Sequence, residues 1–288
     1  MIPAPNSRAE GKAPPAAPGA EAAPNLCLVI PVFNHALTVG RVVREAKALF
    51  PVIVVDDGST DGTGAILAAE PGLTVVTLPR NQGKGAALRA GFERAEKLGF
   101  THAITLDADG QHAVGEASRF AAASRRQPDA FIVGVRDLVR EQAPLSRRVP
   151  NALSTFWFRV ETGLPLADTQ CGYRCYPLRA LRRLRVRSQR YAYELEALVR
   201  GAWSGAELAA QPVSADYAAA TSRLSHFKPG RDLARIALLH ARLTLEAVCL
   251  PARLRAPAAT GEPPRLSFRH KLKAVFRPHF SASSPAPE

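Results

Sequence analysis

The chain has 288 residues, of which 47% are hydrophobic and 22% charged, and its formal net charge is +13. This composition is typical of a globular protein and excludes wholesale disorder. The excess of Lys and Arg attracts phosphate groups on nucleic acid, anionic lipid or a nucleotide. Aromatic residues make up only 7% of the chain. No zinc-finger or aromatic-rich RNA-binding motif is present, so we expect no nucleic-acid partner.

The ends of the chain and its cysteines indicate the cellular setting. Residues 1–25 are rich in Ala and Pro and carry charges, which predicts a disordered tail and not a signal peptide. No long uncharged apolar run occurs, so no membrane span is expected. Cys27 and Cys249 lie in apolar runs and are expected in the core, whereas Cys171 and Cys175 lack the further ligands of a zinc site. A reducing, cytoplasmic setting fits this pattern best.

Apolar strands alternate with helices through the first half of the chain. This alternation predicts right-handed crossovers and a mostly parallel, doubly wound α/β sheet. The pattern predicts strands at 26–30, 52–55, 73–78, 103–106 and 130–135, with helices at 37–49, 65–69 and 85–98.

The second half, from Arg136 onward, is less regular. The periodicity predicts helices at 150–161 and 191–203, a strand at 208–213, and a basic amphipathic helix at 231–250. A flexible basic tail is expected over 251–288.

Polar motifs follow the predicted strands at residues 31–34 (Pro-Val-Phe-Asn), 56–59 (Asp-Asp-Gly-Ser) and 107–109 (Asp-Ala-Asp). Ligands of open parallel sheets lie beyond the carboxyl ends of the strands, so these motifs should meet in one cleft. A carboxylate after the second strand can accept the N–H edge of uracil or guanine. An Asp-x-Asp pair can share Mg²⁺ or Mn²⁺ and a ribose hydroxyl. Each acidic pair alone would be read as a solvated turn, but together they favour function.

With residues 81–85 (Asn-Gln-Gly-Lys-Gly) and 107–112 (Asp-Ala-Asp-Gly-Gln-His), these motifs resemble the donor half of family 2 glycosyltransferases. The branch that they resemble is that of dolichyl-phosphate-mannose synthase and its bacterial relatives. The resemblance is specific from residue 26 to about 136 and looser to about 230. It implies a GT-A domain over 26–230 with a helical C-terminal extension. It also implies an inverting transfer of sugar from a nucleoside-diphosphate sugar.

The resemblance also implies roles for individual residues. The metal would be held by Asp109 and Gln111, and catalysis would use Asp109, Arg136 and Arg148, because arginine forks suit phosphate oxygens. For Arg148 and its neighbour Arg147, a solvated face is the competing interpretation. Lys84 either contacts a phosphate or simply starts a helix. His112 is expected to support the metal ligands or to start a helix, and not to be a ligand itself. The nucleotide-sugar site would comprise Pro31, Phe33, Asn34, Val55, Asp57, Lys84, Asp107 and Ala108.

Acceptor or phosphate contacts are expected from Ser154, Gln170, Arg174, Arg223 and His226. Residues 168–174 resemble the Asp-x-Thr-Ser-Gly-Phe-Arg element of the same branch. Many family 2 enzymes that act on sugar hydroxyls carry a Glu-Asp base there, and this sequence does not. A phosphate acceptor is already ionised and needs no base, so a polyprenyl-phosphate or other lipid-linked acceptor is predicted. Asp168 or Glu194 remains an alternative source of a base, or each pairs with an arginine.

Two interpretations of the helix at 231–250 stay open. Its apolar face either packs in the core or lies in a bilayer interface, where the basic tail would bind an anionic membrane surface. The second interpretation predicts a peripheral protein on the inner face of the cell membrane.

Three other function classes compete with glycosyl transfer. A nucleotidyltransferase would need a Gly-rich phosphate loop after the first strand, where residues 31–34 stand instead. A dehydrogenase would need Gly-x-Gly-x-x-Gly at the same place. A non-enzymatic basic binding protein would have no use for Asp57, Asp107 and Asp109.

Overall fold

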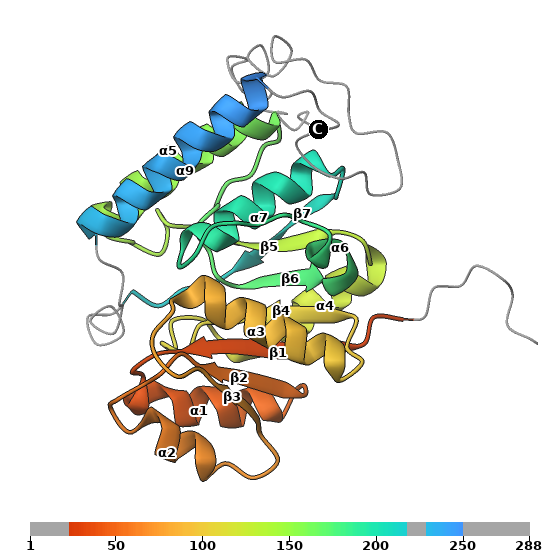
Figure 1. The fold of residues 1–288 in the computed structure, drawn as a ribbon, viewed down its shortest axis with the longest axis vertical. Helices are drawn as coiled ribbons and strands as arrows, with labels where there is room; N and C mark the ends of the chain where they lie inside the picture. Colours follow the sequence, from red (N-terminus) through yellow and green to blue (C-terminus); the bar gives the residue numbers. More distant parts are fainter. Residues whose placement is uncertain (1–22, 218–228, 250–288) are drawn as a thin grey trace, which may run out of the picture.

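A seven-stranded sheet forms the centre of the protein (Figure 1). The computed structural model describes residues 23–217 and 229–249. The strand order is β3-β2-β1-β4-β6-β5-β7, and β6 alone runs antiparallel to its neighbours β4 and β5. The other paired strands are parallel. The predicted doubly wound, mostly parallel α/β sheet is therefore confirmed.

Six of the strands lie where the sequence predicts them, within a residue or two at either end. The short strand β6 has no prediction, because its four residues begin with an arginine and show no alternation of polar and apolar side chains. The strands are β1 (Leu26–Val32), β2 (Val52–Asp56), β3 (Thr74–Thr77), β4 (His102–Thr105), β5 (Phe131–Arg136), β6 (Arg174–Pro177) and β7 (Leu208–Val213).

The predicted helices are also present, with one difference. Helix α5 begins at Leu145 and contains Pro150, whereas the sequence favours a start at Pro150 because proline suits the first turn of a helix. The helices are α1 (Ala36–Lys47), α2 (Thr63–Ala68), α3 (Lys84–Lys97), α4 (Ala117–Arg126), α5 (Leu145–Thr162), α6 (Leu178–Arg182), α7 (Ala192–Trp203) and α9 (Pro229–Cys249), with a 3₁₀ turn at Val114–Glu116.

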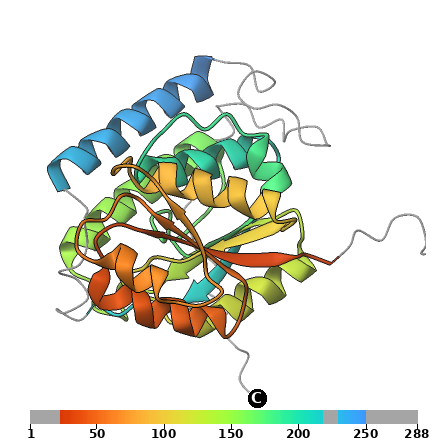
Figure 2. The same cartoon turned by 60° about the horizontal axis from the view of Figure 1, so that its bottom comes forward.

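The sheet buries both faces, because successive residues of a strand point to opposite sides. Val29 and Val55 face the core formed with α3 and α7, to which α5 and α9 also contribute. Leu28 and Val54 face a second core formed with α1, α2 and α4. Figure 2 shows the sheet as the middle layer, with α9 (blue) outermost on one side. Strands buried on both faces explain the nearly continuous apolar runs in the sequence.

Helix α9 places its predicted apolar face in the core. Leu239, Leu243 and Ala247 are buried, and the helix packs against α5 and α7. Its charged face is held by ion pairs to α7, in which Arg242 lies 2.6 Å from Glu196 and Glu246 lies 3.1 Å from Arg200. The outward face carries apolar side chains that the sequence did not single out, among them Leu238 and Leu245, which are 70% and 63% exposed.

The cysteine expectations are partly corrected. Cys27, Cys171 and Cys175 are buried free thiols, but Cys249, expected in the core, is exposed. It follows Val248 on the outward side of α9, because the core-facing stripe of that helix passes through Ala247 instead. The predicted tail beyond residue 250 lies outside the described residues.

We predict that the inward and outward leucines of α9 differ sharply in their contribution to stability. Leu243 is fully buried, so Leu243→Ala should lower the free energy of unfolding by about 2–5 kcal/mol. The exposed Leu245 serves as the matched control, and Leu245→Ala should change it by less than about 0.5 kcal/mol. Urea denaturation measures both values, and equal losses would contradict the described packing of α9.

Candidate active site

The polar motifs meet at one edge of the sheet, where they line a cavity of about 660 Å³. The carboxyl ends of β1, β2, β4 and β5 point to this edge, and so does the start of the antiparallel strand β6. Helices α5, α7 and α9 supply the opposite wall. The predicted residues that line the cavity are Pro31, Phe33, Asp57, Lys84, Asp107, Ala108, Asp109, Gln111, Arg136, Ser154, Gln170 and Arg174.

Asp57 fixes the loop that leads into α3. Its two carboxylate oxygens accept the backbone N–H groups of Gln82 and Gly83, each at 2.7 Å. Burial raises the pKa of Asp57, and these two hydrogen bonds oppose that rise. Gly83 has a φ of +94°, and a Cβ there would lie 2.3 Å from the side chain of Arg190. A carboxylate oxygen can accept more than one hydrogen bond, so Asp57 retains acceptor capacity toward the cavity.

Two predicted nucleotide-site residues support the cavity instead of lining it. Asn34 adopts a positive φ of 54°, and its side-chain oxygen accepts the N–H of Thr60 at 2.7 Å. Its own N–H donates to Ser59, so Asn34 joins the ends of β1 and β2. Val55 is fully buried among core side chains. Their positions therefore do not support the predicted contact of these two side chains with a nucleotide.

Lys84 bridges two carboxylates beneath the cavity. Its ammonium lies 2.7 Å from Asp107 and 3.0 Å from Glu194. Burial disfavours the charged amine, but the two carboxylates outweigh this effect and raise the pKa of Lys84. A Cβ on Gly172 would lie 2.6 Å from both the lysine nitrogen and an Asp107 oxygen, so only glycine fits there. The lysine therefore holds Asp107 and α7 in place, a role that neither sequence interpretation included.

The donor set at the end of β4 fits a hard divalent cation. Burial and the neighbouring Asp107 carboxylate both raise the pKa of Asp109. A bound cation would relieve that repulsion and favour the ionised form. Gln111, whose N–H donates to Asp109 at 3.0 Å, brings an amide beside the carboxylates. Within residues 23–217 and 229–249 no group of three His, Cys, Asp or Glu side chains could hold a metal alone. Hard divalent cations also take oxygen ligands from water and from bound substrate.

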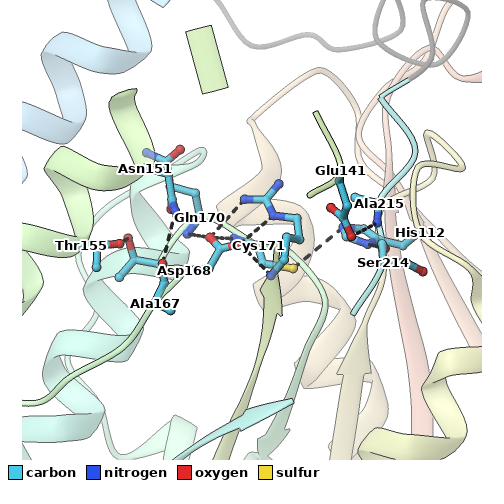
Figure 3. Close-up of polar contacts among 12 residues, drawn as sticks. His112, Glu141, Asn151, Thr155, Ala167, Asp168, Gln170, Cys171, Ser214 and Ala215 are labelled. Atoms are coloured by element: carbon cyan, nitrogen blue, oxygen red, sulfur yellow. Dashed lines mark hydrogen bonds and ion pairs between the residues drawn. The ribbon is translucent and has the colours of Figure 1, made fainter. Parts of the chain in front are cut away.

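The loop before β6 is organised by Asp168 (Figure 3). This fully buried carboxylate forms a bidentate ion pair with Arg136, at 2.6 and 3.1 Å. It also accepts the N–H groups of Gln170 and Cys171. Burial alone would raise the pKa of Asp168, but the Arg136 guanidinium and these hydrogen bonds hold it below its ordinary value. Asp168 therefore positions Arg136 and is not available as a base.

Arg174 also supports this loop. Its fully buried guanidinium donates to the backbone oxygens of Cys171, Glu194 and Thr169 and to the hydroxyl of Tyr176. Four of its five N–H groups are thereby used. Although it borders the cavity, the geometry favours a positioning role over the predicted acceptor contact.

His112 follows the predicted metal ligands in the chain and borders the cavity. Its Nδ1 is 2.8 Å from the backbone oxygen of Ser214, and its Nε2 is 3.8 Å from the sulfur of Cys171 (Figure 3). The imidazole thus joins the segment after β4 to the end of β7 and to the loop before β6.

Helix α5 separates its two neighbouring arginines. Arg147 lines the cavity, whereas Arg148 lines a separate apolar groove on the other side of the helix with Val149 and Phe156. Adjacent helical residues point about 100° apart, so only one of the pair can face the site. The predicted catalytic role of Arg148 is better suited to Arg147. Arg223 and His226 lie outside the described residues.

Several cavity residues escaped the sequence analysis. Arg190 and Tyr191 precede α7, and Arg231, Asp232 and Arg235 belong to α9. Arg235 pairs with the buried Asp232 at 2.9 Å. Arg231 and Arg235 lie one turn apart on the basic side of the predicted helix. This spacing is the feature of the sequence that could have indicated their place in the cavity wall.

We predict that Asp57→Asn weakens binding of UDP or GDP about tenfold. Asparagine replaces one carboxylate oxygen with an N–H₂ donor, so the backbone N–H of Gln82 or Gly83 would lose its acceptor. The contribution of Mn²⁺ to that binding should not change, since Asp57 is not among the metal residues. Calorimetry with and without Mn²⁺ measures both quantities. Asp129→Asn, at an exposed site, is the matched control. Unchanged nucleotide affinity in Asp57→Asn would contradict the role.

The comparisons with known proteins agree with this geometry. Residues 27–184, more than half of the chain, match the family described as Glycosyl transferase family 2. The undecaprenyl-phosphate mannosyltransferase of Micrococcus luteus is 30% identical over 200 residues, which cover 65% of this chain and 81% of that protein. The polyprenol monophosphomannose synthase of Mycolicibacterium smegmatis is 31% identical over 203 residues, covering 65% and 76%.

Solved structures share the fold. Glucosyl-3-phosphoglycerate synthase from Mycobacterium tuberculosis, solved with Mn²⁺, UDP and phosphoglyceric acid, matches with a TM-score of 0.56 at 17% identity, covering 79% of this chain and 80% of that one. S. aureus TarS with UDP matches with a TM-score of 0.52 at 17% identity, covering 80% and 68%. At such identity the likeness concerns the fold alone. With its sheet, its cavity at the strand ends and its matched sequence, the chain is a glycosyltransferase that belongs to glycosyl transferase family 2.

Proposed function

We propose that the protein transfers a sugar from a nucleoside-diphosphate sugar to a polyprenyl phosphate with the help of Mg²⁺ or Mn²⁺. The proposal rests on the ion pairs of Asp168 and Glu194, the two carboxylates that the sequence offers as alternative bases. Asp168 is bound to Arg136, and Glu194 is bound to Lys84. Both carboxylates are thus engaged in ion pairs, which favours an acceptor such as a phosphate that needs no deprotonation. The names of the two relatives, which specify undecaprenyl phosphate and polyprenol, support the same acceptor class.

The donor would occupy the part of the cavity formed by β1, β2 and β4. Pro31 and Phe33 would contact the base, and Asp57 would accept its N–H edge. Asp109 and Gln111 would hold the cation, which, when bound, would neutralise charge developing on the departing diphosphate. The Lys84 ion pair keeps Asp107 ionised and fixed in place, so the carboxylate is ready for the ribose without reorganisation.

The acceptor would enter from the side of α5 and α9. Arg136 and Arg147 line this side, and their guanidinium groups suit phosphate oxygens. Ser154 and Gln170 face the same space, and Gln170 is oriented by a hydrogen bond to the backbone oxygen of Pro150. An acceptor phosphate oxygen would attack the anomeric carbon as its bond to the diphosphate breaks. Direct displacement of this kind inverts the configuration at that carbon.

A transfer assay tests the acceptor class. Full-length protein with Mn²⁺ and a panel of nucleoside-diphosphate sugars should glycosylate undecaprenyl phosphate but not undecaprenol. Asp109→Ala should abolish transfer and remove the effect of Mn²⁺ on nucleotide binding, because it removes a carboxylate ligand. Glu93→Ala, at an exposed position of α3, is the control. Transfer to a sugar hydroxyl but not to the lipid phosphate would contradict the proposal, and normal turnover of Asp109→Ala would contradict the metal assignment.

We also propose that α5 and α9 dock the enzyme on an anionic membrane surface at the cytoplasmic face. Both helices line the cavity on their inner sides and expose apolar side chains on their outer sides. We call these side chains the outer apolar face; they are Leu145, Val149, Leu153 and Phe156 of α5 and Leu238, Leu245 and Val248 of α9.

Arginines border the outer apolar face, which suits a bilayer with anionic headgroups. Arg148 and Arg159 of α5 line the groove beside Phe156. Exposed apolar side chains with basic neighbours are typical of surfaces that lie in a bilayer interface. Within the described parts of the chain, the helices are too short or too polar to cross a bilayer. The proposed membrane contact is therefore the outer apolar face. It is not the apolar stripe predicted for the helix at 231–250, because that stripe lies in the core.

Removing the outer apolar face should reduce membrane binding. The double variant Phe156→Ser, Leu245→Ser should pellet less with phosphatidylglycerol vesicles than the native protein does, since each side chain would lose its buried contact with lipid. Binding of nucleotide in solution should stay unchanged. Val75→Ser, at an exposed site on the edge strand β3, is the control. Equal pelleting of the double variant and the native protein would contradict this docking face.

A further inference from the structure

A chain of three buried polar side chains ends at the cavity wall. Ser154 Oγ lies 3.2 Å from His240 Nε2, and His240 Nδ1 lies 2.9 Å from Glu161 Oε1. Ser154, His240 and Glu161 are 2%, 4% and 0% exposed. Ser154 borders the cavity, whereas the other two stand behind it. We call these three residues the serine relay.

Two helices that lie side by side build the serine relay (Figure 1). Ser154 and Glu161 are about two turns apart on α5 and therefore share one face of that helix. His240 comes from α9 and fits between them. Buried polar groups are costly, and apolar side chains of similar size would join the two helices at least as well. A polar chain that opens into the cavity therefore suggests a use beyond packing.

The hydrogen-bonding capacity of Ser154 limits what its hydroxyl can do. A hydroxyl donates one hydrogen bond and accepts two. Thr169 Oγ1 donates to Ser154 Oγ at 2.9 Å, which fills one acceptor position. The direction of the Ser154 O–H group then depends on whether His240 Nε2 carries a proton.

Glu161 fixes the tautomer of His240. An ionised carboxylate only accepts hydrogen bonds, so the proton of a neutral imidazole lies on Nδ1 and Nε2 is bare. Ser154 then donates to Nε2 and offers the cavity only a lone pair. When the imidazole is protonated, Nε2–H donates to Ser154 Oγ and fills its second acceptor position. The hydroxyl proton then points away from His240 and is available to a group in the cavity.

We propose that His240, held by Glu161, is a positioning residue that turns the Ser154 hydroxyl into a hydrogen-bond donor for the acceptor phosphate. This inference rests on the proposed function, because it takes the anion in the cavity to be the phosphate of a polyprenyl phosphate. Binding of that phosphate and protonation of His240 favour each other. Acceptor affinity should consequently be higher at a low pH than at a high pH.

The surroundings assign this pH dependence to the pair of His240 and Glu161, because burial raises the pKa of the Glu161 carboxyl and its hydrogen bond with His240 opposes that rise. Among the charged groups on the elements packed against α9, Glu161 of α5 is the one that contacts His240. Glu196 and Arg200 of α7 bind Arg242 and Glu246 on a different side of α9. Thr244, one turn from His240, also approaches Glu161 Oε1, at 3.4 Å, but does not contact Ser154. It provides a matched control inside the same buried cluster.

Calorimetry with farnesyl phosphate as the probe tests the proposal on the full-length protein. Affinities are measured at about pH 6 and about pH 8, two values between which histidine side chains in proteins can change their charge. The titration of the probe itself is common to all variants, so differences between variants report on the protein. Farnesol, which lacks the phosphate, measures binding of the isoprenoid chain alone.

Three variants carry the test. Ser154→Ala should lose about tenfold in affinity at the lower pH, which is the effect of one hydrogen bond to a charged group. His240→Gln keeps an N–H donor near Ser154 but cannot titrate, so it should retain affinity at both pH values and lose the excess pH dependence. Thr244→Val should behave like the native protein. Circular dichroism checks that each variant is folded.

The outcomes separate this inference from the proposed function. If native protein and all variants bind farnesyl phosphate equally, with the same pH dependence, the serine relay is only a link between α5 and α9. If native protein binds UDP or GDP with Mn²⁺ but never binds farnesyl phosphate, the acceptor class is wrong and the inference fails with it. If Ser154→Ala loses affinity while His240→Gln keeps the native pH dependence, Ser154 binds the phosphate without help from His240.

Discussion

The ion pair of Lys84 with Asp107 and Glu194 is the interaction on which the site depends. Lys84 begins α3, Asp107 follows β4 and Glu194 lies in α7, so one buried ammonium joins the strand ends on one side of the cavity to the helix on the other. Removing one partner of a buried ion pair costs about 3–5 kcal/mol, since it leaves a charge without compensation. The close approach that a Cβ on Gly172 would obstruct shows how little room surrounds this bridge.

A second buried ion pair extends this framework to the acceptor side. Asp168 holds Arg136 at the end of β5. Arg174, at the start of β6, holds the loop that precedes this strand through the backbone oxygens of Thr169 and Cys171. The antiparallel strand β6 makes this possible, because its first residue lies at the same sheet edge as the last residues of its parallel neighbours. The groups proposed to bind substrate are thus held by buried ion pairs and hydrogen bonds, which limits reorganisation during the reaction.

Helices α5 and α9 connect the cavity with the outside. Their facing sides hold the serine relay, their cavity sides carry Arg147 and Arg231, and their outer sides are apolar. An acceptor drawn from a bilayer would therefore meet its phosphate contacts beside the proposed docking surface. The serine relay would make the contact between Ser154 and that phosphate depend on the protonation of His240.

The sequence by itself determined the sheet, the cavity edge and the residues Asp57, Asp107 and Asp109, because apolar periodicity identifies buried strands and the carboxyl ends of parallel strands always meet at one edge. It left β6 unrecognised and chose Arg148 where the fold presents Arg147. Only the tertiary structure decided that Lys84 and Arg174 support the site and that Ser154 meets His240. These outcomes depend on partners that are remote along the chain, 86 residues apart for Ser154 and His240. Local patterns specify which face of an element is buried, but the pairing of buried polar groups is set by how distant elements pack.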